Sequence, residues 1–148
     1  MKVISLLIFL TLALDNCNNK RSFDRESELN IFLQKNHVDT TNKEDKYVLI
    51  FQNYSCNSCF RDLFDKLSQT INKTPIKKHI VLSKYEASFY NQVKTINNSN
   101  ILIDSLKKLP ELGLSFGADL FIKYENGRVV NWAEISNDNL KKIKNMVN

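Results

Sequence analysis

Two patterns of apolar residues alternate along this chain. Short, unbroken apolar runs rich in β-branched and aromatic residues predict strands that are covered on both faces. Apart from a hairpin near the end of the chain, the strands predicted in this way are residues 47–51, 79–82, where His79 precedes the apolar residues, and 101–103. Each run is followed by a segment whose apolar residues recur at helical spacing, so strands and helices are expected to alternate.

The predicted helices carry one apolar stripe each. They are residues 26–36, residues 56–71, a helix that starts at Ser83, a short stretch around Leu106 and Leu109, and residues 136–147. Ser83 and Glu86 have the spacing of a capping box, in which the serine side chain accepts from the first turn and the glutamate reaches back. This spacing is the reason for placing a helix start at Ser83.

The last two apolar stretches predict a hairpin. Residues 120–124 and 128–132 flank Asn126-Gly127, which is the strongest short-range hairpin signal. These strands should be antiparallel, whereas strands joined through helices need right-handed parallel crossovers. The expected fold class is therefore α/β, a mixed sheet with a C-terminal β-hairpin and flanking helices. At 148 residues, 43% apolar and 25% charged, the chain suits one globular domain.

The first residues predict export. Lys2 is followed by a predominantly apolar run, residues 3–14, which is too short for a bilayer that needs about 20 residues. A short apolar run after a positive start is typical of a secretory signal, so we expect residues 1–16 to be a signal peptide. A buried N-terminal helix or strand is the alternative.

Cys17 predicts a lipid anchor. It stands where a bacterial lipoprotein signal would end, and Leu14 resembles the start of a lipobox, although Asp15 and Asn16 replace the usual small residues. Acylation would also account for a third cysteine without a partner in an oxidising compartment. The alternative is a soluble signal that is cut after Ala13.

This interpretation divides the rest of the chain into a tether with an N-terminal helix, residues 17–44, and a folded domain, residues 45–148. The protein is then expected to be a periplasmic or cell-envelope lipoprotein, anchored to the membrane. The formal net charge of +5 is a modest excess that suits a solvated surface. Because an exported chain does not meet nucleic acid, nucleic acid is excluded as a partner.

The sequence Cys56-Asn57-Ser58-Cys59 follows the first predicted strand and opens a predicted helix. Unpaired N–H groups and the positive end of the helix dipole stabilise a thiolate there, so the pKa of Cys56 is expected to be lowered. Cys59 lies one turn deeper on the same face, near enough to form a disulfide with Cys56. Cys56 would attack a substrate disulfide, and Cys59 would then break the mixed disulfide.

Four neighbours complete the candidate site. Asn57 and Ser58 lie between the cysteines and are expected to tune the redox pair. Tyr54 and Phe60 flank it and are candidates for substrate contact, although Phe60 equally suits the hydrophobic core.

The strand YVLIFQ, the CxxC motif at the following helix, the αβ crossover and the Asn-Gly hairpin resemble the thioredoxin-like superfamily, especially its exported and often membrane-tethered redoxin branch. An extra strand near residues 101–104 is also similar to that branch. The resemblance covers residues 45–148. It implies a three-layer sandwich, a thiol–disulfide oxidoreductase without a cofactor, and protein thiols or disulfides of the cell envelope as partners. We expect a monomer.

The chain departs from that superfamily at two places. Thioredoxins have a cis-proline just before the hairpin, where this chain has Ala118 or Asp119, and Pro110 is too far upstream to replace it. They also have a buried carboxylate in the strand before the motif, where this chain has Ile50. Asp119 is our candidate for either role.

Two other functions remain open. CxxC is also half of many zinc sites, but a closed site needs about four ligands, and His37 and His79 have no paired spacing. We interpret His79, at the start of a strand, as structural. In thioredoxin-like proteins a cis-proline hinders metal capture by the CxxC motif. Because this chain lacks that proline, delivery of copper or zinc remains an open alternative. The other alternative is a non-catalytic binding domain with a structural disulfide.

Overall fold

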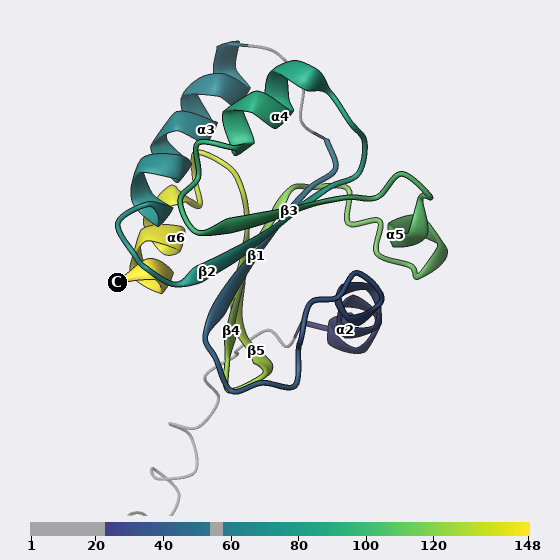
Figure 1. The fold of residues 1–148 in the computed structure, drawn as a ribbon. Coiled ribbons are helices and arrows are strands. Elements are labelled where there is room, and N and C mark those ends of the chain that lie inside the picture. The colour runs from purple at the N-terminus through teal and green to yellow at the C-terminus, as the bar shows by residue number, and fades with distance from the viewer. Residues whose placement is uncertain (1–22, 54–57) are drawn as a thin grey trace, which may run out of the picture.

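Within residues 23–53 and 58–148, which the computed structural model describes except for the side chains of residues 58 and 59, the chain forms a five-stranded mixed sheet (Figure 1). The strands are β1 (Lys46–Phe51), β2 (Lys77–Leu82), β3 (Ser99–Ile103), β4 (Leu120–Glu125) and β5 (Arg128–Glu134). Their order across the sheet is β3-β2-β1-β4-β5. β1, β2 and β3 are parallel, and β4 runs antiparallel to both β1 and β5. The predicted mixed sheet is confirmed.

Helices cover both faces of the sheet. They are α2 (Glu26–Lys35), α3 (Ser58–Ile71), α4 (Ala87–Val93), α5 (Lys108–Glu111) and α6 (Leu140–Val147). Helices α3, α4 and α6 lie on one face, and α2 and α5 on the other (Figure 1). The result is the expected three-layer sandwich.

The side chains of β1 alternate between two hydrophobic cores. Tyr47, Leu49 and Phe51 pack in the core under α3, α4 and α6. Val48 and Ile50 pack in the core under α2 and α5. All six residues of β1 are buried, which explains why this strand reads as an unbroken apolar run. Ile50 is thus an apolar core residue.

The hairpin forms at the predicted turn. Asn126 and Gly127 have φ of 53° and 79°, as a type I′ turn requires. A Cβ at Gly127 would lie 3.0 Å from the carbonyl oxygen of Thr40. The hairpin is joined to α2, because the Tyr124 hydroxyl donates to Asn30 Oδ1 at 3.0 Å.

The capping box predicted at Ser83 is wrong. Ser83 N donates to the carbonyl oxygen of Phe51 at 3.0 Å, and Ser83 Oγ donates to that of Gln52 at 3.3 Å. Ser83 therefore prolongs the pairing of β2 with β1. Helix α4 begins at Ala87, and Glu86 precedes it without a side-chain capping bond.

Candidate active site

The candidate site lies where β1 ends and α3 begins. Cys59 is the second residue of α3. The chain therefore passes from a central strand through the CxxC motif into a helix, as the sequence indicated. Tyr54, Cys56 and Asn57 lie outside the described residues, as does Cys17, and only the backbone of Ser58 and Cys59 is described. The paired-thiol geometry stays a prediction.

Asp119 holds the segment that leads from β1 towards the motif. Its Oδ1 accepts hydrogen bonds from the backbone N–H of Gln52 at 2.6 Å and of Asn53 at 2.8 Å. The Asp119 carbonyl oxygen accepts from Ile135 N at 2.7 Å, which fixes Asp119, directly before β4, against the end of β5. Asp119 is 8% exposed. Burial raises its pKa, and the two N–H donors oppose that rise.

Ala118, the other candidate for the cis-proline place, is half-buried next to Asp119. Every peptide bond among the described residues is trans. The side chain at the predicted place is therefore a hydrogen-bonding carboxylate, and its partners are backbone groups at the end of β1.

Gln52 is a site residue that the sequence analysis missed. Its Nε2 donates to the carbonyl oxygen of Leu114 at 2.5 Å, and its Oε1 accepts from Phe116 N at 3.0 Å. One amide side chain thus ties the loop before β4 to the end of β1. A polar residue directly after an unbroken apolar strand was the available signal, because the carboxyl edge of a parallel sheet commonly carries function.

Phe60 belongs to an aromatic cluster beneath the start of α3. Its ring centroid lies 5.2 Å from that of Phe89, 6.3 Å from Phe51 and 6.4 Å from Phe64. Phe60 is half-buried and packs against the first core. Its core interpretation is therefore confirmed, and this packing anchors the helix turn that contains Cys59.

A cavity of about 300 Å³ opens at the same edge of the sheet. We call it the edge cavity. It is lined by Gln52, Asn53, Ser83, Asp104, Lys107, Leu109, Pro110, Ser115 and Gly117. The ends of β1, β2 and β3 form one side, and the segment from α5 to β4 forms the other.

Asp104 organises the α5 side of the edge cavity. Its Oδ1 accepts from Lys108 N at 2.7 Å, and its Oδ2 accepts from Leu109 N at 2.8 Å. Its carbonyl oxygen accepts from Lys107 N at 3.1 Å. Asp104 is 5% exposed, so this carboxylate is used inside the protein and does not face a ligand.

His79 lies near the opposite, amino-terminal end of β2. It is 4% exposed, and its Nδ1 has no hydrogen-bond partner among the described residues. Burial, with help from the charges of Lys77 and Lys46, lowers the pKa of His79 to about 4. Its place in the sheet agrees with the structural role inferred from the sequence. Among the described residues, no cluster of three His, Cys, Asp or Glu side chains is arranged to hold a metal.

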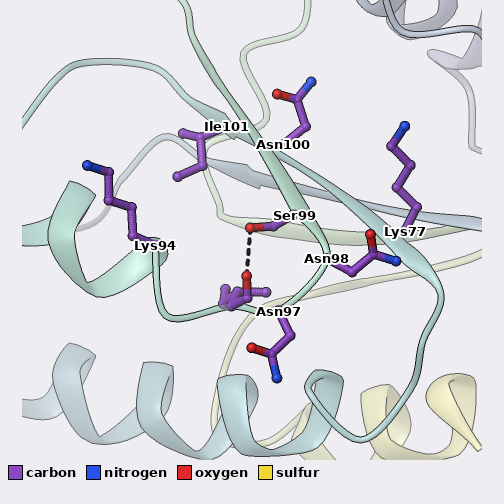
Figure 2. A pocket seen from close by; sticks show the side chains of 8 residues that line it. Lys77, Lys94, Asn97, Asn98, Ser99, Asn100 and Ile101 are labelled. Atoms are coloured by element: carbon purple, nitrogen blue, oxygen red, sulfur yellow. Dashed lines mark hydrogen bonds between the residues drawn. The ribbon is translucent and has the colours of Figure 1, made fainter.

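A second cavity, of about 430 Å³, lies at the amino ends of β2 and β3 (Figure 2). Lys77 and Lys94 line it, but Figure 2 shows their side chains diverging. Ser99 Oγ donates a hydrogen bond to the carbonyl oxygen of Ile96 at 2.7 Å. Because the two ammonium groups do not converge, we assign no anion site there.

Sequence comparisons give no relative, since no model of a known protein family and no curated protein matches this chain. A solved structure does match: a secreted Mycobacterium tuberculosis disulfide oxidoreductase described as homologous to E. coli DsbE. The match has a TM-score of 0.54 and 10% sequence identity, and covers 73% of this chain and 83% of that chain. Within the described ranges, every helix is too short or too polar to span a lipid bilayer. With its mixed sheet and helices on both faces, the chain has a thioredoxin-like α/β fold.

Proposed function

We propose that this protein is an exported thiol–disulfide oxidoreductase that acts through Cys56 and Cys59. The observation that carries the proposal is the position of the CxxC motif, which follows β1 in the chain and ends in the first turn of α3, in a thioredoxin-like fold. A thiol at the start of a helix is stabilised as a thiolate, which is the reactive form. The similarity to a secreted disulfide oxidoreductase supports the same chemistry.

The reaction consists of two exchanges. The Cys56 thiolate attacks one sulfur of a substrate disulfide, forms a mixed disulfide and releases the other substrate sulfur as a thiolate. The Cys59 thiolate then attacks the Cys56 sulfur, closes the Cys56–Cys59 disulfide and releases the second substrate thiolate. The substrate gains two electrons and the cysteine pair loses two. Run in reverse, the oxidised pair oxidises a substrate dithiol.

The surrounding residues position the motif for this reaction. Asp119 and Gln52 fix the chain that enters it, and the cluster around Phe60 fixes the helix that leaves it. Tyr54, Asn57 and Ser58 are proposed to flank the sulfurs and to tune their reactivity. We propose that its partners are protein thiols or disulfides of the cell envelope, and that the protein acts as a monomer.

The test is a comparison of two cysteine variants. Dithiothreitol should reversibly reduce a Cys56–Cys59 disulfide in the mature protein. Cys59→Ser should accumulate mixed disulfides, because its attacking thiol remains, and Cys56→Ser should not. Stoichiometric copper or zinc on the reduced protein, without exchange of model disulfides, would instead identify a metal carrier. A disulfide that does not exchange and whose loss unfolds the domain would identify a structural bridge.

The location is proposed separately, from the sequence. Residues 1–16 are proposed to be a signal peptide, and Cys17 the acylated first residue of the mature chain. Mass spectrometry of the mature N-terminus should show a lipid-modified Cys17. Cys17→Ser should move the protein from the membrane fraction to the soluble fraction; cleavage after Ala13 without lipid would contradict the anchor.

A further inference from the structure

We infer that the edge cavity, with Leu106 and Lys107 on its rim, binds the extended segment of a partner polypeptide beside the partner's reacting cysteine, and favours segments that carry apolar and acidic residues. This inference rests on the proposed function, because it names the class of substrate that Cys56 would meet. It does not require any described side chain to react.

The position and lining of the cavity suit a polypeptide. Asn53 lines it, and the CxxC motif begins three residues further along the chain. A volume of about 300 Å³ is at the lower end of the range for ligand pockets, so it fits one or two residues of a longer chain that extends past it. Asn53 and Ser115 make no side-chain hydrogen bond within the described residues, so their polar groups are available to a peptide backbone.

The rim presents a large apolar side chain on an ordered turn. Leu106 is 72% exposed, the most exposed of the large apolar side chains among the described residues. It stands in the chain between Asp104 and Lys107, which both line the cavity. Isolated exposed leucines are ordinary, so exposure alone carries no weight.

What distinguishes Leu106 is the turn that holds it. Lys107 has a left-handed backbone with φ of 53°, which costs free energy for a residue with a side chain. Asp104 stabilises that turn through both carboxylate oxygens, and Leu109 at its end is fully buried. The backbone that carries Leu106 is therefore held in place before a partner binds, which reduces the entropy lost on binding.

The charge at this edge is positive on the outside. The two carboxylates nearby, Asp104 and Asp119, are buried and accept hydrogen bonds from the backbone. Lys108 is paired with Glu111 at 2.6 Å. Lys107 is exposed and has no ion pair within the described residues, so it complements an acidic side chain on the partner.

The inference is tested by peptide binding without redox chemistry. The protein is the Cys56→Ser/Cys59→Ser double variant, with the reduced wild-type protein as a second form in case the variant folds poorly. The probes are two fluorescent synthetic peptides with serine in place of cysteine, one with leucine and glutamate beside it and the other with leucine and lysine. Fluorescence anisotropy should show tighter binding of the glutamate peptide.

Variants of the rim should change that binding specifically. Leu106→Ser should weaken binding of both peptides by roughly fivefold to tenfold, and Lys107→Glu should reverse the preference between them. Ile31→Ser, an exposed apolar residue of α2, and Lys77→Glu, at the amino-terminal end of the sheet, are matched controls and should leave both affinities unchanged. Equal binding of the two peptides, or equal losses in the controls, would overturn the inference.

Failure of the inference is distinguishable from failure of the proposed function. Exchange of a small model disulfide by wild-type protein is measured in parallel. Exchange without selective peptide binding overturns the peptide site alone. Selective binding without exchange supports the peptide site and overturns the redox assignment.

Discussion

Asp119 Oδ1 lies 2.8 Å from the backbone nitrogen of Asn53 and accepts its hydrogen bond. A residue at the start of β4 thereby fixes the chain that leaves β1. The same oxygen accepts from Gln52 N, so one carboxylate serves two adjacent N–H groups. These are the last described backbone donors before the CxxC motif.

Asp119→Ala should therefore destabilise the protein. The change leaves two partly buried N–H groups without their acceptor, and because water can reach them in part, the cost should be about 1 kcal/mol each, at the lower end of the range for lost hydrogen bonds. Asp119→Asn keeps an acceptor oxygen and should lose less. Urea denaturation measures both free energies of unfolding, and the same loss in the two variants would show that shape rather than hydrogen bonding explains the effect.

The ionisation of Asp119 predicts a pH dependence. Because its pKa is raised in the folded protein, its contribution to stability is present at low pH and is lost as pH rises through the folded pKa. Asp119→Asn cannot titrate. The difference in unfolding free energy between Asp119→Asn and wild type should therefore shift in favour of the variant as pH rises, and a difference that is independent of pH would contradict the assignment.

The fold was predictable from the sequence where local spacing reports burial. The stripe of α3 and the turn at Asn126 and Gly127 depend on neighbours within a few residues, and both were found. The network of Asp119 with Gln52 was not found, because it joins residues 67 apart in the sequence and leaves no periodic trace. Asp119 was named from the family pattern, but its partners were not.

Ser83 shows why a local rule fails. Its sequence context satisfies a capping box, but its N–H and hydroxyl are bonded to Phe51 and Gln52 at the end of β1. Hydrogen bonds to residues distant in the sequence therefore decide the conformation of Ser83, and the local capping pattern does not. These hydrogen bonds hold Ser83 beside the end of β1, where it lines the edge cavity.

His79 predicts loss of stability on acidification. Its pKa is 6.5 as a free side chain and about 4 in the folded protein, where burial disfavours the charged ring. Above pH 6.5 it is neutral in both states. Between pH 6.5 and 4 the unfolded chain binds a proton that the folded protein does not. The free energy of unfolding therefore decreases by up to about 3 kcal/mol as the pH is lowered through this range.

The measurement is a series of urea denaturation curves across that range. His79→Gln removes the titration and should flatten the profile. His37→Asn, at an exposed position whose left-handed backbone asparagine tolerates, is the control and should keep the wild-type slope. A slope that persists in His79→Gln would assign the acid sensitivity to other groups.

The aromatic cluster predicts a graded series of losses. Phe89 is 2% exposed and packs against Phe51 at 5.1 Å and Phe60 at 5.2 Å between ring centroids. Phe89→Ala should cost about 3–5 kcal/mol, and Phe89→Leu much less. Phe60→Ala should cost less than Phe89→Ala, because Phe60 is half-buried.

The Phe60 variant has a local consequence as well. Removing its ring loosens the packing of the α3 turn that contains Cys59, so amide hydrogen exchange should accelerate there more than at the end of α3. Uniform acceleration along the helix would show that Phe60 contributes to global stability alone.

Gln52 offers a test of how the loop before β4 is held. Gln52→Ala leaves the Phe116 N–H and the Leu114 carbonyl without their side-chain partner, and should cost about 1–3 kcal/mol. In Gln52→Glu an ionised carboxylate meets the Leu114 carbonyl oxygen, so both atoms are acceptors. That variant should be less stable than wild type at neutral pH and should recover part of the difference on acidification, when the protonated side chain can donate again.

Amide hydrogen exchange at Phe116 should accelerate in both variants of Gln52. Asn53→Ala, which changes an exposed side chain at the same edge, is the control and should leave that exchange rate unchanged. Exchange at Phe116 that is indifferent to residue 52 would show that the loop is held by its other contacts.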